Sequence, residues 1–335
     1  MTSFMISVRK KGDDGKMAAT PRYLTLDDAG VATEVSMTAW RKAVLAAFPE
    51  VNAQGLPKGD LMFFVHGFNV SFDHACKGDL DNIAKLKAQG WDGVYASFDW
   101  PSFGTAVGYY GDRSNARASA NALIDTALAM FVAMQQPDCE ASVSVMAHSM
   151  GAFVVRQAFC WAYQDTKLNN KAWSISQLIL VAGDVATGSL SEDQEGGYWL
   201  DKYVGRTTCY SNRFDSVLKI SDIKNGEPTP RAGRVGLPDD APASFCNVDC
   251  SDLFKSLHFS LGAGLDPATP HCFYFDRPEF WQDAVLTLGG GIDREAIPSR
   301  TSDLTAATAS RFLLQLQPMA ATDYAAALKL AQLGK

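Results

Sequence analysis

A strand, a sharp turn and a helix follow one another without a break at residues 142–155, SVSVMAHSMGAFVV. Ser149 is at the tip of the turn, with Ala147 two residues before it and Gly151 two residues after it. A strand and a helix that cross this closely leave no room for larger side chains at those two positions. The segment therefore predicts a buried strand, a helix packed on the sheet, and a serine hydroxyl lifted clear of the sheet edge.

The composition is that of a globular protein without a nucleic-acid partner. Of the 335 residues, 47% are hydrophobic and 20% are charged, which is enough apolar material for one large core. The net charge of -7 provides no basic surface for nucleic acid, and no apolar run is long enough to span a membrane. The first basic residues follow a short apolar run, the reverse of a secretory signal, so we expect a cytoplasmic protein. The oligomeric state is left open.

Apolar runs alternate with amphipathic segments along most of the chain, which predicts an α/β fold with a doubly wound, mostly parallel sheet. An antiparallel hairpin is expected at the start, from apolar runs at residues 4–8 and 23–26 on either side of a charged turn. The strand at residues 244–249 is expected to be the last. The other predicted strands, besides the one before Ser149, are at residues 61–69, 93–98, 177–184 and 207–212. The other predicted helices are at residues 36–48, 73–89, 115–135 and 278–288.

We predict a single domain that spans residues 1–335. Residues 1–60 supply the hairpin and a helix, residues 61–290 form the catalytic core, and residues 291–335 form a C-terminal helical segment. Residues 222–270 are rich in Pro, Gly and Asp at their start and irregular at their end. Because such segments often cover a site, we expect lid-like insertions or pocket walls there.

A serine hydroxyl needs a histidine to take its proton, and the chain has five histidines. Three of them are poorly placed to be the base: one lies in the elbow, one lies at the His-Gly turn after an upstream strand, and one begins a helix near that turn. With the chain order nucleophile, acid, histidine, the base follows the last strand, and His271 meets that condition. His258, in an amphipathic stretch, remains the alternative base. The three less suitable histidines are His66, His74 and His148.

A carboxylate is needed to orient the histidine, and two aspartates are candidates. Asp184 follows the predicted strand at residues 177–184, and Asp215 follows the strand at residues 207–212 by a short loop. The sites of parallel sheets lie beyond the carboxyl ends of the strands, which fits both residues. We favour Asp215 and keep Asp184 as the alternative acid.

Two backbone N–H groups are expected to form an oxyanion hole. Met150 begins the helix after the turn, and the N-terminus of a helix favours negative charge. Phe68 lies in the loop after an upstream strand, where the preceding Gly67 allows the backbone to approach a substrate closely. We therefore predict that the N–H groups of Phe68 and Met150 act together.

Several segments together resemble the alpha/beta-hydrolase superfamily and, within it, the bacterial hydrolases of unknown function grouped as DUF900. The resemblance covers about residues 61–288 and implies the alpha/beta-hydrolase fold, with Ser149 as nucleophile, Asp215 as acid and His271 as base. The chain departs from the family pattern at Ala147, which replaces a glycine, and in a long insert between Asp215 and His271. The segments that carry it are FVHGFN (64–69), FDWPS (98–102), YGDR (110–113), AHSMG (147–151), SNRFDSVL (211–218) and PHCFY (270–274).

The resemblance also implies that residues 100–102 and 110–113 shape the sheet edge and the pocket rather than react. The residues that we expect to line the substrate pocket are His66, His148 and Trp100.

The function predicted from these features is a serine hydrolase that cleaves a carboxylic ester, thioester or amide through an acyl-enzyme. Its partner is a small-molecule acyl substrate, and no cofactor and no metal are expected. The seven cysteines are scattered and odd in number, which predicts free thiols rather than a disulfide framework or a zinc site. Two alternatives stay open: a hydrolase-fold binding module with a vestigial site, and a serine-dependent acyltransferase or perhydrolase. An aspartate-nucleophile hydrolase is disfavoured because the elbow tip is serine.

Overall fold

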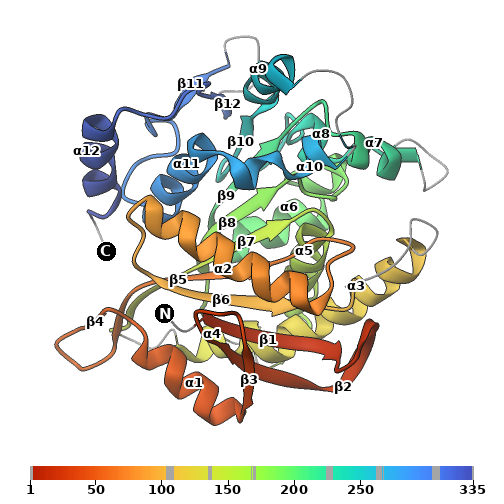
Figure 1. Ribbon diagram of the computed structural model, residues 1–335, viewed down its shortest axis with the longest axis vertical. Helices are drawn as coiled ribbons and strands as arrows, with labels where there is room; N and C mark the ends of the chain where they lie inside the picture. The colour runs from red at the N-terminus through yellow and green to blue at the C-terminus, as the bar shows by residue number, and fades with distance from the viewer. Residues whose placement is uncertain are drawn as a thin grey trace. The chain divides into compact units, whose positions relative to one another are not determined.

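Mostly parallel strands with flanking helices make up the structure, which is a computed structural model (Figure 1). It describes residues 3–102, 109–134, 138–166, 168, 171–223, 229–261, 266, 268–303 and 310–333, with side chains except at 109–113, 133–134, 222–223 and 258–261. The chain divides into two compact units. The first unit contains residues 1–87 and 92–175, and the second unit contains residues 88–91 and 176–335.

The first unit has a mixed sheet with the strand order β7-β5-β6-β1-β2-β3, and β4 pairs with β5. Strands β7, β5, β6 and β1 run parallel to one another, whereas β2 and β3 continue the sheet in antiparallel fashion. The apolar residues 61–65 of β5 and the whole of β6 are buried, as expected for central strands of a parallel sheet. The strands are β1 (Ser3–Lys10), β2 (Asp13–Leu26), β3 (Ala32–Val35), β4 (Glu50–Val51), β5 (Pro57–Val65), β6 (Val94–Asp99) and β7 (Glu140–His148).

The predicted antiparallel hairpin at the N-terminus is present, with a turn at Lys11 and Gly12. It does more than start the sheet, because β1 also pairs in parallel with β6, with Phe4 opposite Ala96 and Ser7 opposite Asp99. The hairpin is thus joined directly to a central strand.

The helices of the first unit follow the apolar patterns closely. Ser36 caps the first of them by accepting a hydrogen bond from the Ala39 N–H at 3.2 Å. The single helix expected at residues 115–135 begins earlier and contains a π-helical turn, which a periodicity of 3.6 residues cannot reveal among many alanines. The helices are α1 (Met37–Ala46), α2 (Phe72–Ala88), α3 (Tyr109–Leu123), the π-helix η2 (Ile124–Leu128), α4 (Ala129–Met134) and α5 (Met150–Ala162).

The second unit has the strand order β8-β9-β10-β12-β11. Strand β10 pairs in parallel with β9 and β12, and β11 is antiparallel to β12. The prediction that the strand at residues 244–249 is the last was therefore wrong, and residues 291–335 contain two strands besides a helix. Both strands are too short for an alternating pattern to stand out. The strands are β8 (Ile175–Val181), β9 (Val204–Ser211), β10 (Phe245–Asp249), β11 (Arg300–Ser302) and β12 (Arg311–Leu314).

Helices fill the connections of the second unit. Residues 222–270, where lid-like segments were expected, contain α8, β10 and α9 in their described part, and β10 is an inner strand of the sheet. Apolar residues of α11 and α12 form a shared cluster around Leu286 and Tyr324. The helices are η3 (Thr187–Leu190), α6 (Glu195–Tyr203), α7 (Ser216–Ile223), α8 (Ala232–Val235), α9 (Ser251–Leu261), α10 (Thr269–Cys272), η4 (Phe273–Asp276), α11 (Pro278–Gly289) and α12 (Ala321–Ala331).

None of the helices in the described ranges combines the length and the apolar character needed to cross a bilayer.

Candidate active site

Ser149 stands between β7 and α5 with backbone dihedrals of φ 53° and ψ -123°. This combination is strained for a residue with a side chain, and strain of this kind gathers at functional sites. The tight turn is imposed by close packing, because a Cβ on Gly151 would lie 2.5 Å from the carbonyl oxygens of Val65 and His66. The strand, turn and helix expected from the sequence are therefore present, and glycine is required at position 151.

The N-terminus of α5 begins directly after the candidate nucleophile. Met150 is the first residue of the helix, so its N–H is one of the amides that find no carbonyl partner within the helix. The helix dipole adds partial positive charge at the same place. This end of the helix can stabilise an oxyanion formed next to Ser149.

The loop that follows β5 lies against the turn that holds Ser149. A Cβ on Gly67 would be 2.9 Å from the Ser149 Cβ and 3.0 Å from the Nδ1 atom of half-buried His148. Phe68, the second predicted oxyanion donor, follows Gly67 and is half-buried. The structure thus brings the Phe68 backbone into the neighbourhood of Ser149 and Met150 within the first unit.

His66 and Trp100 support this loop. The His66 ring is stacked on the Trp100 indole, with 5.6 Å between the ring centroids. The His66 Nδ1 atom is 2.9 Å from the Gly67 carbonyl oxygen. Trp100 is completely buried, and its Nε1–H donates to the His66 carbonyl oxygen at 2.8 Å. Both side chains have partners inside the unit, which is typical of residues that hold a loop; that they line a substrate pocket stays a prediction.

A buried ion pair lies next to His66. Asp99, at the end of β6, contacts the His66 Nε2 atom at 3.2 Å and accepts from Arg9 Nη2 at 2.7 Å. Burial alone would raise the pKa of Asp99, but its hydrogen bonds and charge interactions with His66 and Arg9 lower that pKa below its ordinary value. Sequence reasoning gave Asp99 and Arg9 no role in the site, although an aspartate at the end of a buried strand is the signal that singled out Asp184.

In the second unit, Asp215 and His271 are hydrogen-bonded. The His271 Nδ1 atom is 2.7 Å from Asp215 Oδ2, and both side chains are buried. A carboxylate can only accept, so Nδ1 is the donor in this bond, and in the neutral ring Nε2 is the nitrogen that can act as a base. The other oxygen, Asp215 Oδ1, accepts from the Leu218 N–H at 2.9 Å at the start of α7, which fixes the carboxylate.

Asn212 is a further residue that holds this pair and that sequence reasoning missed. Its side-chain Nδ2 donates to the Pro270 carbonyl oxygen at 2.8 Å, directly before His271, while its Oδ1 accepts from the Phe214 N–H at 3.1 Å. Asn212 therefore ties the end of β9 to α10. An asparagine between a buried strand and the candidate acid was the available signal.

The alternative acid, Asp184, has other partners. It lies 3.3 Å from the Arg231 Nε atom and accepts from the Ser221 hydroxyl at 2.8 Å, and both Asp184 and Arg231 are buried. His271 is thus bonded to Asp215, whereas Asp184 belongs to a separate buried cluster. The alternative base, His258, lies in α9, and its side chain is outside the described residues.

Beside α10 lies a cavity of about 410 Å³ within the second unit. Its apolar lining comes mainly from Leu257, Ala268 and Phe273, and Cys272, next to His271, reaches its wall. The carboxylates of Asp266 and Asp276 also line it. Within the described residues, no cluster of three or more His, Cys, Asp or Glu side chains could hold a metal ion.

Comparison with known proteins places more than half of the chain in a family. A family model described as "Alpha/beta hydrolase of unknown function (DUF900)" matches residues 49–242, which include Phe68, Ser149 and Asp215 and end before His271.

Individual relatives are distant. The uncharacterized protein alr1448 of Nostoc sp. strain PCC 7120 is 25% identical over 266 residues, which are 71% of this chain and 65% of that protein. The chain therefore spans less than two thirds of the length of this relative. The crystal structure of a dienelactone hydrolase-like promiscuous phosphotriesterase from metagenomic libraries aligns with 74% of this chain and 82% of its own chain, at 12% identity and a TM-score of 0.31.

Proposed function

Because the chain belongs to the alpha/beta hydrolases of unknown function grouped as DUF900, we propose that it is a serine hydrolase that cleaves a carboxylic ester. The observation that carries the proposal is the backbone of Ser149, held at φ 53° and ψ -123° at the N-terminus of α5. A strained serine in front of a helix N-terminus is the arrangement that activated serine nucleophiles use.

The proposed reaction proceeds in two halves. The Ser149 hydroxyl attacks the ester carbonyl carbon while the His271 Nε2 atom takes its proton, and the Asp215 carboxylate stabilises the resulting imidazolium. The N–H groups of Met150 and Phe68 stabilise the oxyanion. When the C–O bond breaks, the departing alkoxide takes the proton from His271 and leaves Ser149 acylated. A water molecule, deprotonated by His271, then attacks the acyl carbon, the bond to Ser149 Oγ breaks, and the proton on His271 passes to Ser149 Oγ as the acid is released.

The substrate is a small acyl compound, and the apolar part of the cavity beside α10, at Leu257, Ala268 and Phe273, favours an apolar acyl chain. A series of p-nitrophenyl esters from acetate to decanoate measures the acyl chain that fits best. Thioester and amide analogues of the best chain then rank the three bond types.

Substitution of Ser149 by alanine tests the mechanism. We expect at least about a 1,000-fold loss of kcat, because the nucleophile is removed while the fold stays intact. The matched control is Ser142→Ala in the same strand, which should keep full activity. A fluorophosphonate probe should label the wild type and the Ser142→Ala variant but not the Ser149→Ala variant; equal labelling of all three would exclude Ser149 as the nucleophile.

The same experiment separates the alternative functions. A binding module with a vestigial site would show neither labelling nor turnover in the wild type. A serine-dependent acyltransferase or perhydrolase would be labelled, but its turnover would depend on an added alcohol, amine or peroxide acceptor.

A further inference from the structure

Arg9, in the N-terminal hairpin, is buried to 1% exposure although it carries a charge. Its Nη2 donates to three oxygens: Asp99 Oδ1 at 2.7 Å, the Trp100 carbonyl at 2.7 Å and the Val70 carbonyl at 2.8 Å. Two of these partners lie at the end of β6, and the third lies in the loop between β5 and α2. One guanidinium therefore ties three separate parts of the first unit together.

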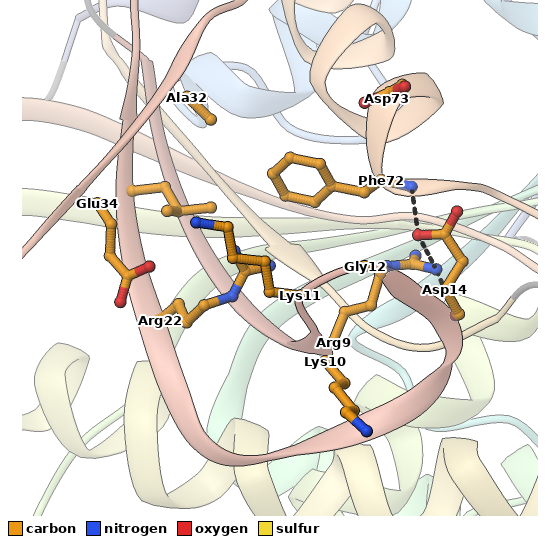
Figure 2. Close-up of a pocket in the computed structure, with 11 residues that line it drawn as sticks. Arg9, Lys10, Lys11, Gly12, Asp14, Arg22, Ala32, Glu34, Phe72 and Asp73 are labelled. Atoms are coloured by element: carbon orange, nitrogen blue, oxygen red, sulfur yellow. Dashed lines mark hydrogen bonds and ion pairs between the residues drawn. The ribbon is translucent and has the colours of Figure 1, made fainter.

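Asp14, across the hairpin turn, holds the same loop further along, at Phe72. Its Oδ1 accepts from the Phe72 N–H at 3.2 Å and lies 3.5 Å from Arg9 Nη1 (Figure 2). Its carbonyl oxygen also accepts from Arg9 Nη1 at 2.6 Å. The loop is thus fastened to the hairpin at Val70, and the first residue of α2, Phe72, is fastened to it as well.

The fastened loop contains the candidate oxyanion donor. Phe68 is two residues before Val70, and between them Asn69 is held in the left-handed region at φ 57°. Gly67 lies against Ser149, because a Cβ on Gly67 would come within 2.9 Å of the Ser149 Cβ. A donor in such a loop acts only if its N–H points at the oxyanion, so whatever fixes the loop fixes the donor.

We propose that the N-terminal hairpin is part of the active site, with Arg9 and Asp14 as positioning residues for the Phe68 N–H. This inference rests on the proposed serine hydrolase function. It assigns a catalytic purpose to residues that lie outside the span of 49–242 matched by the family model. It also extends the machinery beyond the core expected at residues 61–290.

A purely structural role would also explain a buried arginine, and the second unit provides the reference for it. Arg300 and Asp283 form an ion pair of the same kind, with Nη2 and Oδ1 2.7 Å apart and both side chains fully buried. Arg300 also donates to the Thr287 hydroxyl, at 2.5 Å. The Arg300 pair joins α11 to β11, so its loss should weaken the fold without moving the Phe68 loop.

The test compares four variants by kcat and KM on a p-nitrophenyl ester and by Ki of an alkyl trifluoromethyl ketone, whose serine adduct places an oxyanion in the hole. Arg9→Lys keeps the charge and loses the forked contacts, and we expect kcat to fall about 10- to 100-fold with KM nearly unchanged. Asp14→Ala, at a half-exposed position, should lower kcat about 3- to 10-fold. In both variants Ki should rise by the same factor as kcat falls. The controls Asp13→Ala and Arg300→Lys should keep the wild-type kcat and Ki per folded molecule.

The outcomes separate the two proposals. A wild type that is neither labelled by fluorophosphonate nor active overturns the proposed function, and this inference with it. An active, labelled wild type whose Arg9→Lys and Asp14→Ala variants keep its kcat and Ki overturns this inference alone. If circular dichroism shows that Arg9→Lys does not fold, the inference is decided by comparing the kcat and Ki of Asp14→Ala with those of Asp13→Ala.

Discussion

Ser149 in the first unit and the Asp215–His271 pair in the second unit are held in place by different means. In the first unit, Ser149 is placed by the shape of the backbone: glycines at 67 and 151 let the loop and the helix approach closer than any side chain would allow. In the second unit, Asp215 and His271 are placed by side-chain hydrogen bonds, with Asn212 and the start of α7 as anchors. The position of Ser149 should therefore be sensitive to added atoms, and the position of the Asp215–His271 pair to lost hydrogen bonds.

The largest effect is expected from Gly151→Ala. The added Cβ would meet two backbone carbonyl oxygens at 2.5 Å, and neither can move without breaking the contact between β5 and α5. We expect a loss of more than about 3 kcal/mol in the free energy of unfolding, or no folded protein. Gly78→Ala in α2 is the matched control, because nothing lies within 4 Å of a Cβ added there. This variant should raise the free energy of unfolding by about 0.5–1 kcal/mol. Denaturant unfolding measures both, and equal stability of the two variants would refute the packing argument.

Asp215→Asn should abolish most activity while leaving the fold intact. The amide can still accept from the Leu218 N–H, but it presents an N–H to His271 Nδ1 and forces the wrong tautomer. By analogy with other serine hydrolase triads, we expect kcat to fall about 10,000-fold. Asp184→Asn is the comparison, and kcat measured per folded molecule should stay near the wild-type value. The reverse result would make Asp184 the acid.

Asn212→Ala should have an intermediate effect on activity. It removes the bond to the Pro270 carbonyl that sets the position of His271, so we expect a fall in kcat of about 10-fold and a loss of about 1–2 kcal/mol of stability. Asn247, another buried amide of the second unit, donates to the Ser211 hydroxyl at 3.2 Å. Asn247→Ala should lose similar stability with kcat unchanged, and a common fall in both variants would show that Asn212 has no special role.

The smallest effect on activity is expected from Asp79→Asn in α2. Burial raises the pKa of Asp79 to about 7, although Ser97 and Tyr95 donate hydrogen bonds to it. Since the unfolded pKa is about 4, the folded state holds an extra proton between about pH 4 and 7, and stability should decline as the pH rises through that range. The variant should lack this decline and be about 4 kcal/mol more stable than the wild type at pH 8. Urea unfolding at pH 5 and pH 8 measures the free energy of unfolding of both proteins. The same change between the two pH values in the wild type and the variant would contradict a raised pKa of Asp79.

The same contrast explains what the sequence could predict. The elbow was predictable because its constraint is local: Ala147, Ser149 and Gly151 lie within five residues and report a tight crossing directly. The alternating apolar runs predicted the mostly parallel sheet for the same reason. The short strands β11 and β12 were not predicted, because the formation of strands of this length depends on pairing with neighbouring strands rather than on their own apolar pattern.

Contacts between distant segments were beyond the sequence. Asp184 and Asp215 both follow buried strands, and only their partners in space, Arg231 and His271, distinguish them. Arg9 gave no signal because its role depends on β1 pairing with β6, which brings it next to Asp99. That pairing is a property of the strand order and not of either segment.

The backbone conformation of Ser149 also affects which substitutions are favoured at this position during evolution. At φ 53° and ψ -123° glycine is the residue with the least strain, and serine costs about 1–3 kcal/mol of folding stability. Mutation to glycine would therefore raise stability, and only a use for the hydroxyl opposes it. A duplicate of the gene that lost its activity would drift toward glycine at this position. Under the proposed function, the use of the hydroxyl is what would keep serine at residue 149.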